Sequence, residues 1–224
     1  MLIAGLPPRL PRAVVFDMDG LMLDTERLDR WAWQTVASRH GFDFTDSLHA
    51  TLIGRCSAET ETELRAHVGP LIDFASVRGE VSALWRERVA ATGVPLKPGL
   101  RELLDRLDSL RIPKAVATST VRASALASLG ALRARLDAAV YGDEVERGKP
   151  APDIYLRAAE ALGVAPAACI ALEDSLPGVA SARAAGMTVV MVPDLVAPTA
   201  SVPPVCDSLS TFARWLEAGL AASA

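Results

Sequence analysis

The sequence predicts an α/β protein, in which a doubly wound parallel sheet carries a small helical domain inserted after its first strand. Along most of the chain, short apolar runs alternate with segments whose apolar residues recur at helical spacing, a pattern typical of parallel strands joined by helical crossovers. From about residue 26 to residue 92, the helical spacing continues without strand-like alternation. We therefore expect an α/β core formed by residues 1–25 and 93–224, and a helical domain formed by residues 26–92.

The first strand is predicted over residues 13–16, a run of β-branched and aromatic residues that Asp17, Met18 and Asp19 follow directly. Because successive side chains of an extended segment point to opposite faces, the two aspartates share a direction and can meet at one reaction centre. Taken alone, Asp-x-Asp-Gly also fits an ordinary acidic turn or part of a calcium loop. The calcium loop is disfavoured, because Leu28 stands where such a loop needs a glutamate.

The other elements follow from periodicity and from the positions of glycine and proline. In the insertion, apolar residues recur at Trp31, Trp33 and Val36, at Leu64 and Val68, and at Val81, Leu84, Trp85 and Val89. Core helices are predicted over residues 100–110, 122–129 and 153–162. A further helix is predicted to end at about residue 185, and another lies around Phe212 and Trp215. The later strands are predicted over residues 115–117, 138–141, 168–172 and 188–192.

Polar side chains stand at the ends of two further strands. Hydroxyl residues occupy positions 118–120 after the second strand, and Glu173, Asp174 and Ser175 follow the fourth. In open parallel sheets, ligands bind beyond the carboxyl ends of the strands. We expect these residues to gather with Asp17 at that edge of the sheet.

Lys149 ends the segment GDEVERGK, which superficially resembles a phosphate-binding P-loop. The P-loop is excluded, because five residues separate the two glycines and Pro150 stands where a magnesium-binding hydroxyl is required. The prolines at positions 150 and 152 nevertheless restrict the backbone, so Lys149 is presented from a rigid loop. The alternative is an ordinary solvated surface lysine.

Four segments together, FDMDGLMLDTE, ATST, GKPAPD and LEDS, resemble in order and spacing the four motifs of the haloacid dehalogenase-like phosphotransferase superfamily. The resemblance covers essentially the whole chain. It implies a Rossmann-like core, and the helical insertion looks like the small helical cap of that superfamily. Within the superfamily, the sequence is most similar to the β-phosphoglucomutase-like group, which includes many sugar-phosphate and nucleotide phosphatases.

The resemblance also implies roles for individual residues. Asp17 is the implied nucleophile, and Asp19 the acid and base that protonates the leaving oxygen and then activates water. The hydroxyl of Thr118, the backbone amide of Ser119 and the ammonium of Lys149 are the implied phosphate ligands. Magnesium is implied to bind Asp17, the main-chain carbonyl of Asp19, Glu173 and Asp174. Charge supports a cation here, because two like unit charges about 4 Å apart repel by roughly 4 kcal/mol at an effective dielectric of 20.

The expected function is a magnesium-dependent phosphatase of a sugar phosphate or nucleoside monophosphate that works through an aspartyl-phosphate. A sugar phosphomutase is the alternative, and a non-catalytic metabolite-binding protein is less favoured. The mutase is disfavoured for two reasons. Asp29 stands where β-phosphoglucomutases carry a cap-entry histidine, and the position of their cap arginine falls near Ser57 in this sequence. Arg55 is a displaced candidate for reading the substrate. Asp19 argues against a dehalogenase, because the dehalogenases of the superfamily lack this second aspartate.

Composition sets the remaining expectations for the 224-residue chain. A net charge of -4 and a pI near 5.4 argue against a nucleic-acid partner. No leader or membrane span is apparent in the sequence, so we expect a cytoplasmic protein that binds neither membrane nor nucleic acid. Three widely spaced cysteines are too few for a disulfide framework or a zinc site. A monomer or weak homodimer that binds a small phosphomonoester is expected.

Overall fold

The computed structural model describes residues 3, 6, 10–52, 57–195 and 204–221. The chain divides into two compact units, one formed by Met1–Leu23 with Leu96–Ala224 and the other by Asp24–Pro95. We call them the core unit and the helical unit. Within the described residues, no helix is both long and apolar enough to cross a membrane.

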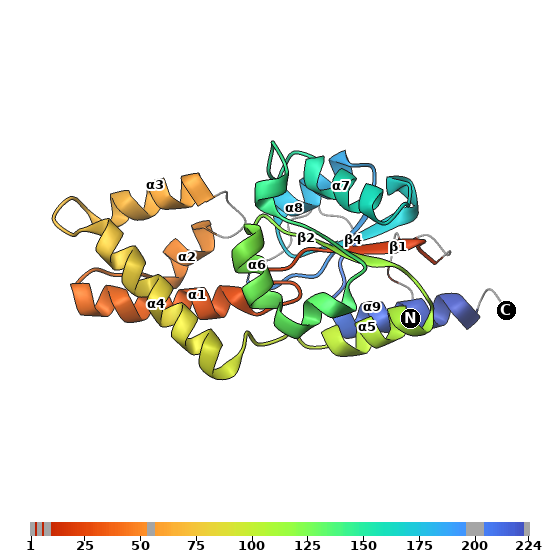
Figure 1. The fold of residues 1–224 in the computed structure, drawn as a ribbon, viewed down its shortest axis with the longest axis horizontal. Helices are drawn as coiled ribbons and strands as arrows, with labels where there is room; N and C mark the ends of the chain where they lie inside the picture. Colours follow the sequence, from red (N-terminus) through yellow and green to blue (C-terminus); the bar gives the residue numbers. More distant parts are fainter. Residues whose placement is uncertain (1–2, 4–5, 7–9, 53–56, 196–203, 222–224) are drawn as a thin grey trace. The chain divides into compact units, whose positions relative to one another are not determined.

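The core unit is built on a parallel sheet of five strands in the order β3-β2-β1-β4-β5. Strands β1, β2 and β4 are labelled in Figure 1. The strands are β1 (Ala13–Phe16), β2 (Lys114–Ala117), β3 (Ala138–Val140), β4 (Cys169–Glu173) and β5 (Thr188–Met191). In the register of β1, Val15 lies opposite Ala115 on one side and Ala171 on the other. The predicted α/β class with a parallel sheet is confirmed.

Helices cover both faces of the sheet, which explains why its strands are apolar on both sides. On one face, α7 (Asp153–Ala161) and α8 (Leu176–Ala184) bury Val15, Ala117 and Ala171. On the opposite side, α5 (Leu100–Ser109) packs against α9 (Leu209–Ala221) (Figure 1). The remaining helices of the core unit are α6 (Arg122–Leu129) and the short 3-10 turns η1 (Gly130–Arg135), η2 (Gly142–Glu144) and η3 (Pro166–Ala168).

Strand β4 continues one residue further than the sequence predicts. Glu173 is its last residue and pairs with Met191 of β5, and its carbonyl accepts a hydrogen bond of 2.7 Å from the amide of Val192. A charged residue tolerates this buried position because its carboxylate is fully hydrogen-bonded, as described below.

The helical unit consists of α1 (Thr25–His40), α2 (Asp46–Leu52), α3 (Ser57–Val68) and α4 (Phe74–Thr92). Its apolar centre is a stack of aromatic rings. The ring centroid of Trp33 lies 5.5 Å from that of Phe44 and 6.3 Å from that of Phe74. Helix α2 has no counterpart in the predicted elements. Its seven residues are too few to display a helical period, and its first turn is capped by the Thr45 hydroxyl, which accepts from the amide of Leu48. Arg55 lies outside the described residues.

The two ends of the helical unit are close together in space. The amide of Asp24 donates to the carbonyl of Pro95 at 2.8 Å. One residue further out on each side, Leu23 and Leu96 of the core unit form an antiparallel bridge, and the amide of Lys97 donates to Met22. The insertion therefore leaves the core unit and returns to it at one point.

Candidate active site

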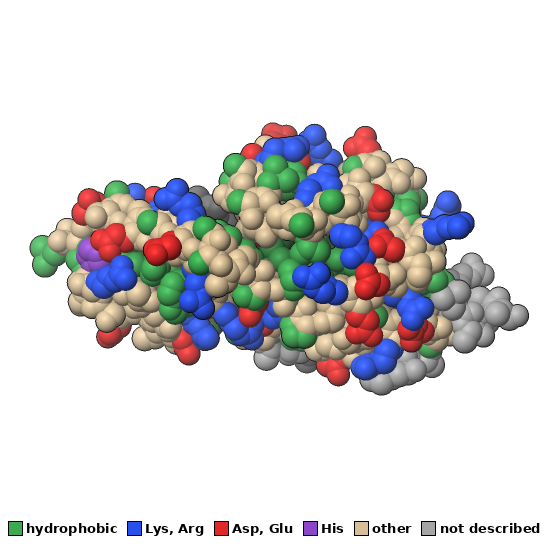
Figure 2. Space-filling view, turned by 60° about the horizontal axis from the view of Figure 1, so that its bottom comes forward, with side chains coloured by type: hydrophobic (Ala, Val, Ile, Leu, Met, Phe, Trp, Pro, Cys, Tyr) green, Lys and Arg blue, Asp and Glu red, His purple; other side chains and the backbone are tan. Residues whose placement is uncertain are grey.

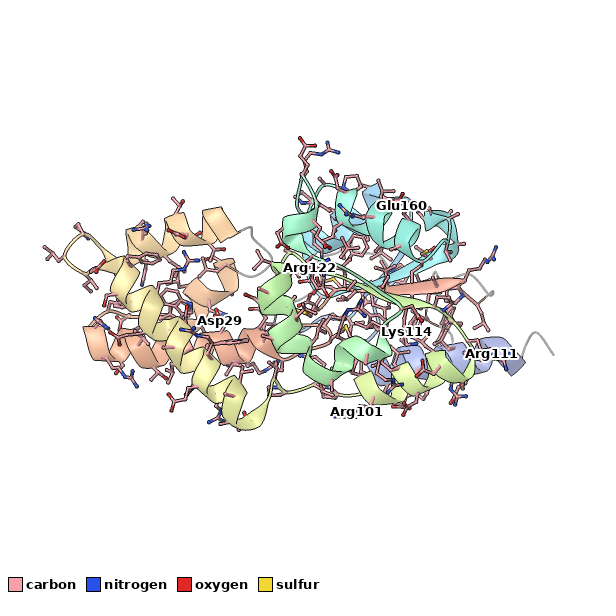
Figure 3. All side chains as sticks on the ribbon, viewed as in Figure 1. Asp29, Arg101, Arg111, Lys114, Arg122 and Glu160 are labelled. Carbon is pink, nitrogen blue, oxygen red and sulfur yellow. The ribbon has the colours of Figure 1, made fainter. Side chains whose placement is uncertain are left out.

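The candidate site lies at the carboxyl ends of β2, β1 and β4, which are neighbours in the sheet. Asp17 directly follows β1, Thr118 follows β2, and Glu173 ends β4. Figure 3 orients this edge: Lys114 marks the amino end of β2, and Arg122 begins α6 beyond its carboxyl end. The sequence expectation that the polar residues at these strand ends gather at one edge is met by the fold.

Asp17 and Asp19 are held by a tight turn that follows β1. The amide of Asp17 still donates to Leu172 of β4 at 3.0 Å, so the extended conformation reaches the first aspartate. Gly20 then adopts a φ of 78°, in the left-handed region that glycine enters without strain, and the amide of Leu23 closes the turn onto Met18. The turn is therefore built to present both carboxylates.

Lys149 reaches this cluster from the loop that precedes α7. Its ammonium donates to Oδ1 of Asp17 and, at 2.6 Å, to Oε1 of Glu173, and its side chain is only 5% exposed. The surface-lysine alternative is thereby excluded. Burial by itself lowers the pKa of Lys149, but Asp17 and Glu173 outweigh this effect and raise that pKa above its usual value. The ammonium stays charged.

Negative charge exceeds positive charge in the cluster. Burial raises the pKa of Asp17, and Glu173 and Asp19 add to the rise, although Lys149 opposes it. One ammonium does not compensate several buried carboxylates, so the site favours the binding of a further cation.

Three of these carboxylates are arranged to hold a metal ion. Asp17, Glu173 and Asp174 are all buried, and each offers an oxygen such that the three oxygens lie within 4.8 Å of one another. Oxygen donors with an excess of negative charge fit a hard divalent cation. The three carboxylates therefore form a candidate site for such a cation.

Glu173 is also saturated by hydrogen bonds from the protein. Its Oε1 accepts from the Tyr155 hydroxyl at 2.5 Å as well as from Lys149, and its Oε2 accepts from the Ser175 amide at 3.2 Å and the Ser175 hydroxyl at 3.0 Å. Gly178 of α8 makes room for this carboxylate, since a Cβ there would lie 1.8 Å from Oε1. Direct metal coordination by Glu173 would require it to release one of these donors.

Two threonine hydroxyls orient Asp19. Thr118 donates to its Oδ2 at 3.1 Å, and Thr120 donates to the same oxygen at 2.7 Å. The Thr118 hydroxyl in turn accepts from the Thr120 amide at 3.1 Å. The loop is held from behind by Gly142, where a Cβ would lie 2.0 Å from the carbonyl oxygen of Ser119.

Sequence reasoning assigned no role to two residues of the site, Thr120 and Tyr155. Thr120 had a usable signal, because it lies two positions after Thr118 and therefore faces the same way, like Asp19 relative to Asp17. Tyr155 had none, because it occupies a buried position of α7 beside Ile154 and cannot be told from a core residue by spacing.

Comparison with known proteins agrees with this arrangement. Residues 11–186 match the family model of haloacid dehalogenase-like hydrolases. Protein CbbY of Rhodobacter capsulatus is 36% identical over 193 residues, covering 81% of this chain and 85% of the relative. A phosphorylated carbohydrates phosphatase of Thermotoga maritima is 37% identical over 177 residues, covering 78% and 82%. The crystal structure of a putative β-phosphoglucomutase from Thermotoga maritima superposes with a TM-score of 0.77 at 32% identity, covering 92% and 98%.

Proposed function

The chain belongs to the haloacid dehalogenase-like hydrolases, and from that premise we propose that it is a magnesium-dependent phosphatase of a small phosphorylated metabolite. The observation that carries the proposal is the contact between Asp17 and Lys149, which are 132 positions apart in the sequence and meet beside Glu173. A buried nucleophile, a fixed cation and an acidic metal set in one place suit phosphoryl transfer.

In the first step, a carboxylate oxygen of Asp17 attacks phosphorus, and the bond from phosphorus to the substrate oxygen breaks. Asp19 gives its proton to that leaving oxygen, and an aspartyl-phosphate remains on Asp17. Lys149 stays charged throughout and stabilises both the nucleophile and the phosphoryl oxygens. The hydroxyl of Thr118 and the amide of Ser119 are the proposed ligands of those oxygens.

In the second step, Asp19 acts as a base. It takes a proton from a water molecule whose oxygen attacks phosphorus, so that inorganic phosphate leaves and the Asp17 carboxylate is restored. Thr120 supports this role because its hydroxyl donates to Oδ2 of Asp19 and so helps to hold that carboxylate in place. A water molecule and a phosphate ester are the only reactants needed.

We assign the metal to Asp17, Asp174 and the main-chain carbonyl of Asp19, with Glu173 completing the acidic set. Magnesium is favoured, because it binds few carboxylates and keeps sites open for phosphate oxygens. When bound, the metal neutralises charge that would otherwise repel the substrate.

The helical unit is the proposed cap that selects the substrate, with Arg55 as the candidate residue that reads it. A phosphorylated carbohydrate is the first class to test, since one relative carries that name, and nucleoside monophosphates are the second. On the face drawn in Figure 2, basic and acidic side chains are interspersed and form no basic stripe, in keeping with a small-molecule partner. We also propose a cytoplasmic enzyme that is a monomer or weak homodimer.

The test is release of inorganic phosphate from a panel of sugar phosphates and nucleoside monophosphates with Mg²⁺. Asp17→Asn should abolish turnover, whereas Asp207→Asn, which makes the same change at an exposed position of the core unit, should not. Absence of turnover by the unaltered protein across the panel would refute the proposal. Isomerisation of a sugar phosphate without net phosphate release would indicate the mutase instead.

A further inference from the structure

Tyr155 is a buried polar group that the proposed mechanism leaves without a role. Its hydroxyl donates to Oε1 of Glu173 at 2.5 Å, and its ring centroid lies 5.2 Å from the ammonium nitrogen of Lys149. Burial, together with the charges of Glu173 and Asp17, raises the pKa of the Tyr155 phenol well above its usual value, so it stays a neutral donor. The same side chain therefore contacts both the anion and the cation of this pair.

The arrangement matters because Oε1 of Glu173 accepts hydrogen bonds from both Lys149 and Tyr155. It accepts from Lys149 at 2.6 Å and from the Tyr155 hydroxyl, while the other oxygen is held by Ser175. If the hydroxyl were absent, Lys149 would be the only donor to Oε1 among the described residues, and the position of that oxygen would depend on the ammonium. With the hydroxyl present, Oε1 is fixed independently of Lys149.

An ammonium group has three protons, and two of those on Lys149 are directed at Asp17 and Glu173. When both acceptors are fixed, the direction of the third proton is fixed as well. The face of the Tyr155 ring adds an attraction that holds the ammonium in place.

We propose that Tyr155 is a positioning residue, which holds Glu173 by its hydroxyl and Lys149 by its ring so that the third ammonium proton points at the phosphoryl group. This inference rests on the proposed phosphatase function. It assigns a part in the reaction to a residue that touches neither the substrate nor the nucleophile.

The kinetic test compares Tyr155→Phe with Tyr141→Phe. Tyr141 is the matched control, because it is equally buried in the core unit and its hydroxyl has no hydrogen-bond partner among the described residues. For Tyr155→Phe we expect kcat to fall about tenfold with KM changed less than about twofold, because the lost hydrogen bond is made to a charged group. A kcat equal to that of Tyr141→Phe would overturn the inference.

A second measurement does not depend on turnover. The chain has only three lysines, Lys97, Lys114 and Lys149, so the side-chain NMR spectrum of lysine-labelled protein contains three sets of signals. The spectrum of the Lys149→Met variant lacks the Lys149 signals and so identifies them. Lys97 and Lys114 serve as internal references, because each is held by its own carboxylate elsewhere, Asp194 and Asp108.

We expect Tyr155→Phe to shift the Lys149 signals while those of Lys97 and Lys114 stay in place, and Tyr141→Phe to shift none of them. Unchanged Lys149 signals in Tyr155→Phe would refute the positioning role. If the unaltered protein hydrolyses no phosphomonoester but the Lys149 signals shift, the proposed function fails while the Tyr155 network stands.

Discussion

Replacing Gly178 by alanine tests the position of the Glu173 carboxylate. The added Cβ would lie 1.8 Å from Oε1, 2.0 Å from Cδ and 2.2 Å from Oε2, whereas real Cβ contacts are essentially never under 3.0 Å. The carboxylate would have to move by about 1 Å or more. It cannot do so and keep its four hydrogen bonds, whose lengths run from 2.5 to 3.2 Å.

The expected change in the free energy of unfolding combines two destabilising contributions and one stabilising contribution. Overpacking a buried site costs about 1–3 kcal/mol. Loss of one hydrogen bond to a charged group costs about 1.5–3 kcal/mol. The higher helix propensity of alanine returns about 1 kcal/mol. We expect a net loss of about 3 kcal/mol in the free energy of unfolding of the core unit.

Amide hydrogen exchange in β1 and β4 measures this loss within the core unit itself. Gly79→Ala is the control, because it makes the same change in a helix, α4, at a position with nothing within 4 Å of the new Cβ. It should stabilise α4 by up to about 1 kcal/mol and leave kcat unchanged. If Gly178→Ala keeps wild-type exchange rates and wild-type kcat, the carboxylate of Glu173 does not lie against α8.

Three further predictions concern the site, the metal and the thiols. Thr120→Val should lower kcat about tenfold, because it removes one of the hydroxyl donors that hold Asp19. Thr120→Ser keeps the hydroxyl and should stay within about twofold of wild type; equal losses in both variants would contradict the hydrogen-bond role. Chelation with EDTA should abolish phosphate release, and Mg²⁺ should restore it; turnover in excess EDTA would rule out a metal requirement. In Cys56→Ser protein at pH 8, Cys169 and Cys206 should react with a thiol reagent only in denaturant, because burial raises the pKa of both thiols and lowers their thiolate fraction; fast labelling of the native protein would disprove it.

Much of the fold follows from sequence periodicity. The strands are short apolar runs between helical segments, and glycine and proline separate them, so their order along the chain is accessible without coordinates. Their order in the sheet is not, because nothing local distinguishes β1 between β2 and β4 from other parallel arrangements. Helix α2 escaped prediction for the same local reason, since seven residues do not establish a period.

For the site, the sequence indicates residues whose type is unusual at their position. Asp17 after a buried strand and Lys149 in a proline-restricted loop are of this kind, and the fold brings them into contact. Tyr155 and Gly178 are not, since a tyrosine or a glycine on a packed helix is unremarkable until Glu173 is seen beside it. Their roles depend on tertiary packing, which periodicity does not encode.

The ends of the helical unit, Asp24 and Pro95, lie side by side, so the unit could be replaced by another insertion at one junction. Because Asp24 and Pro95 are hydrogen-bonded to each other, the chain could be rejoined there by a linker of a few residues at little entropic cost. Every group assigned to the chemistry lies outside residues 24–95, apart from the candidate Arg55. Under the proposed function, recombination at this single junction would change the unit proposed to select the substrate and would leave the groups assigned to the chemistry in place.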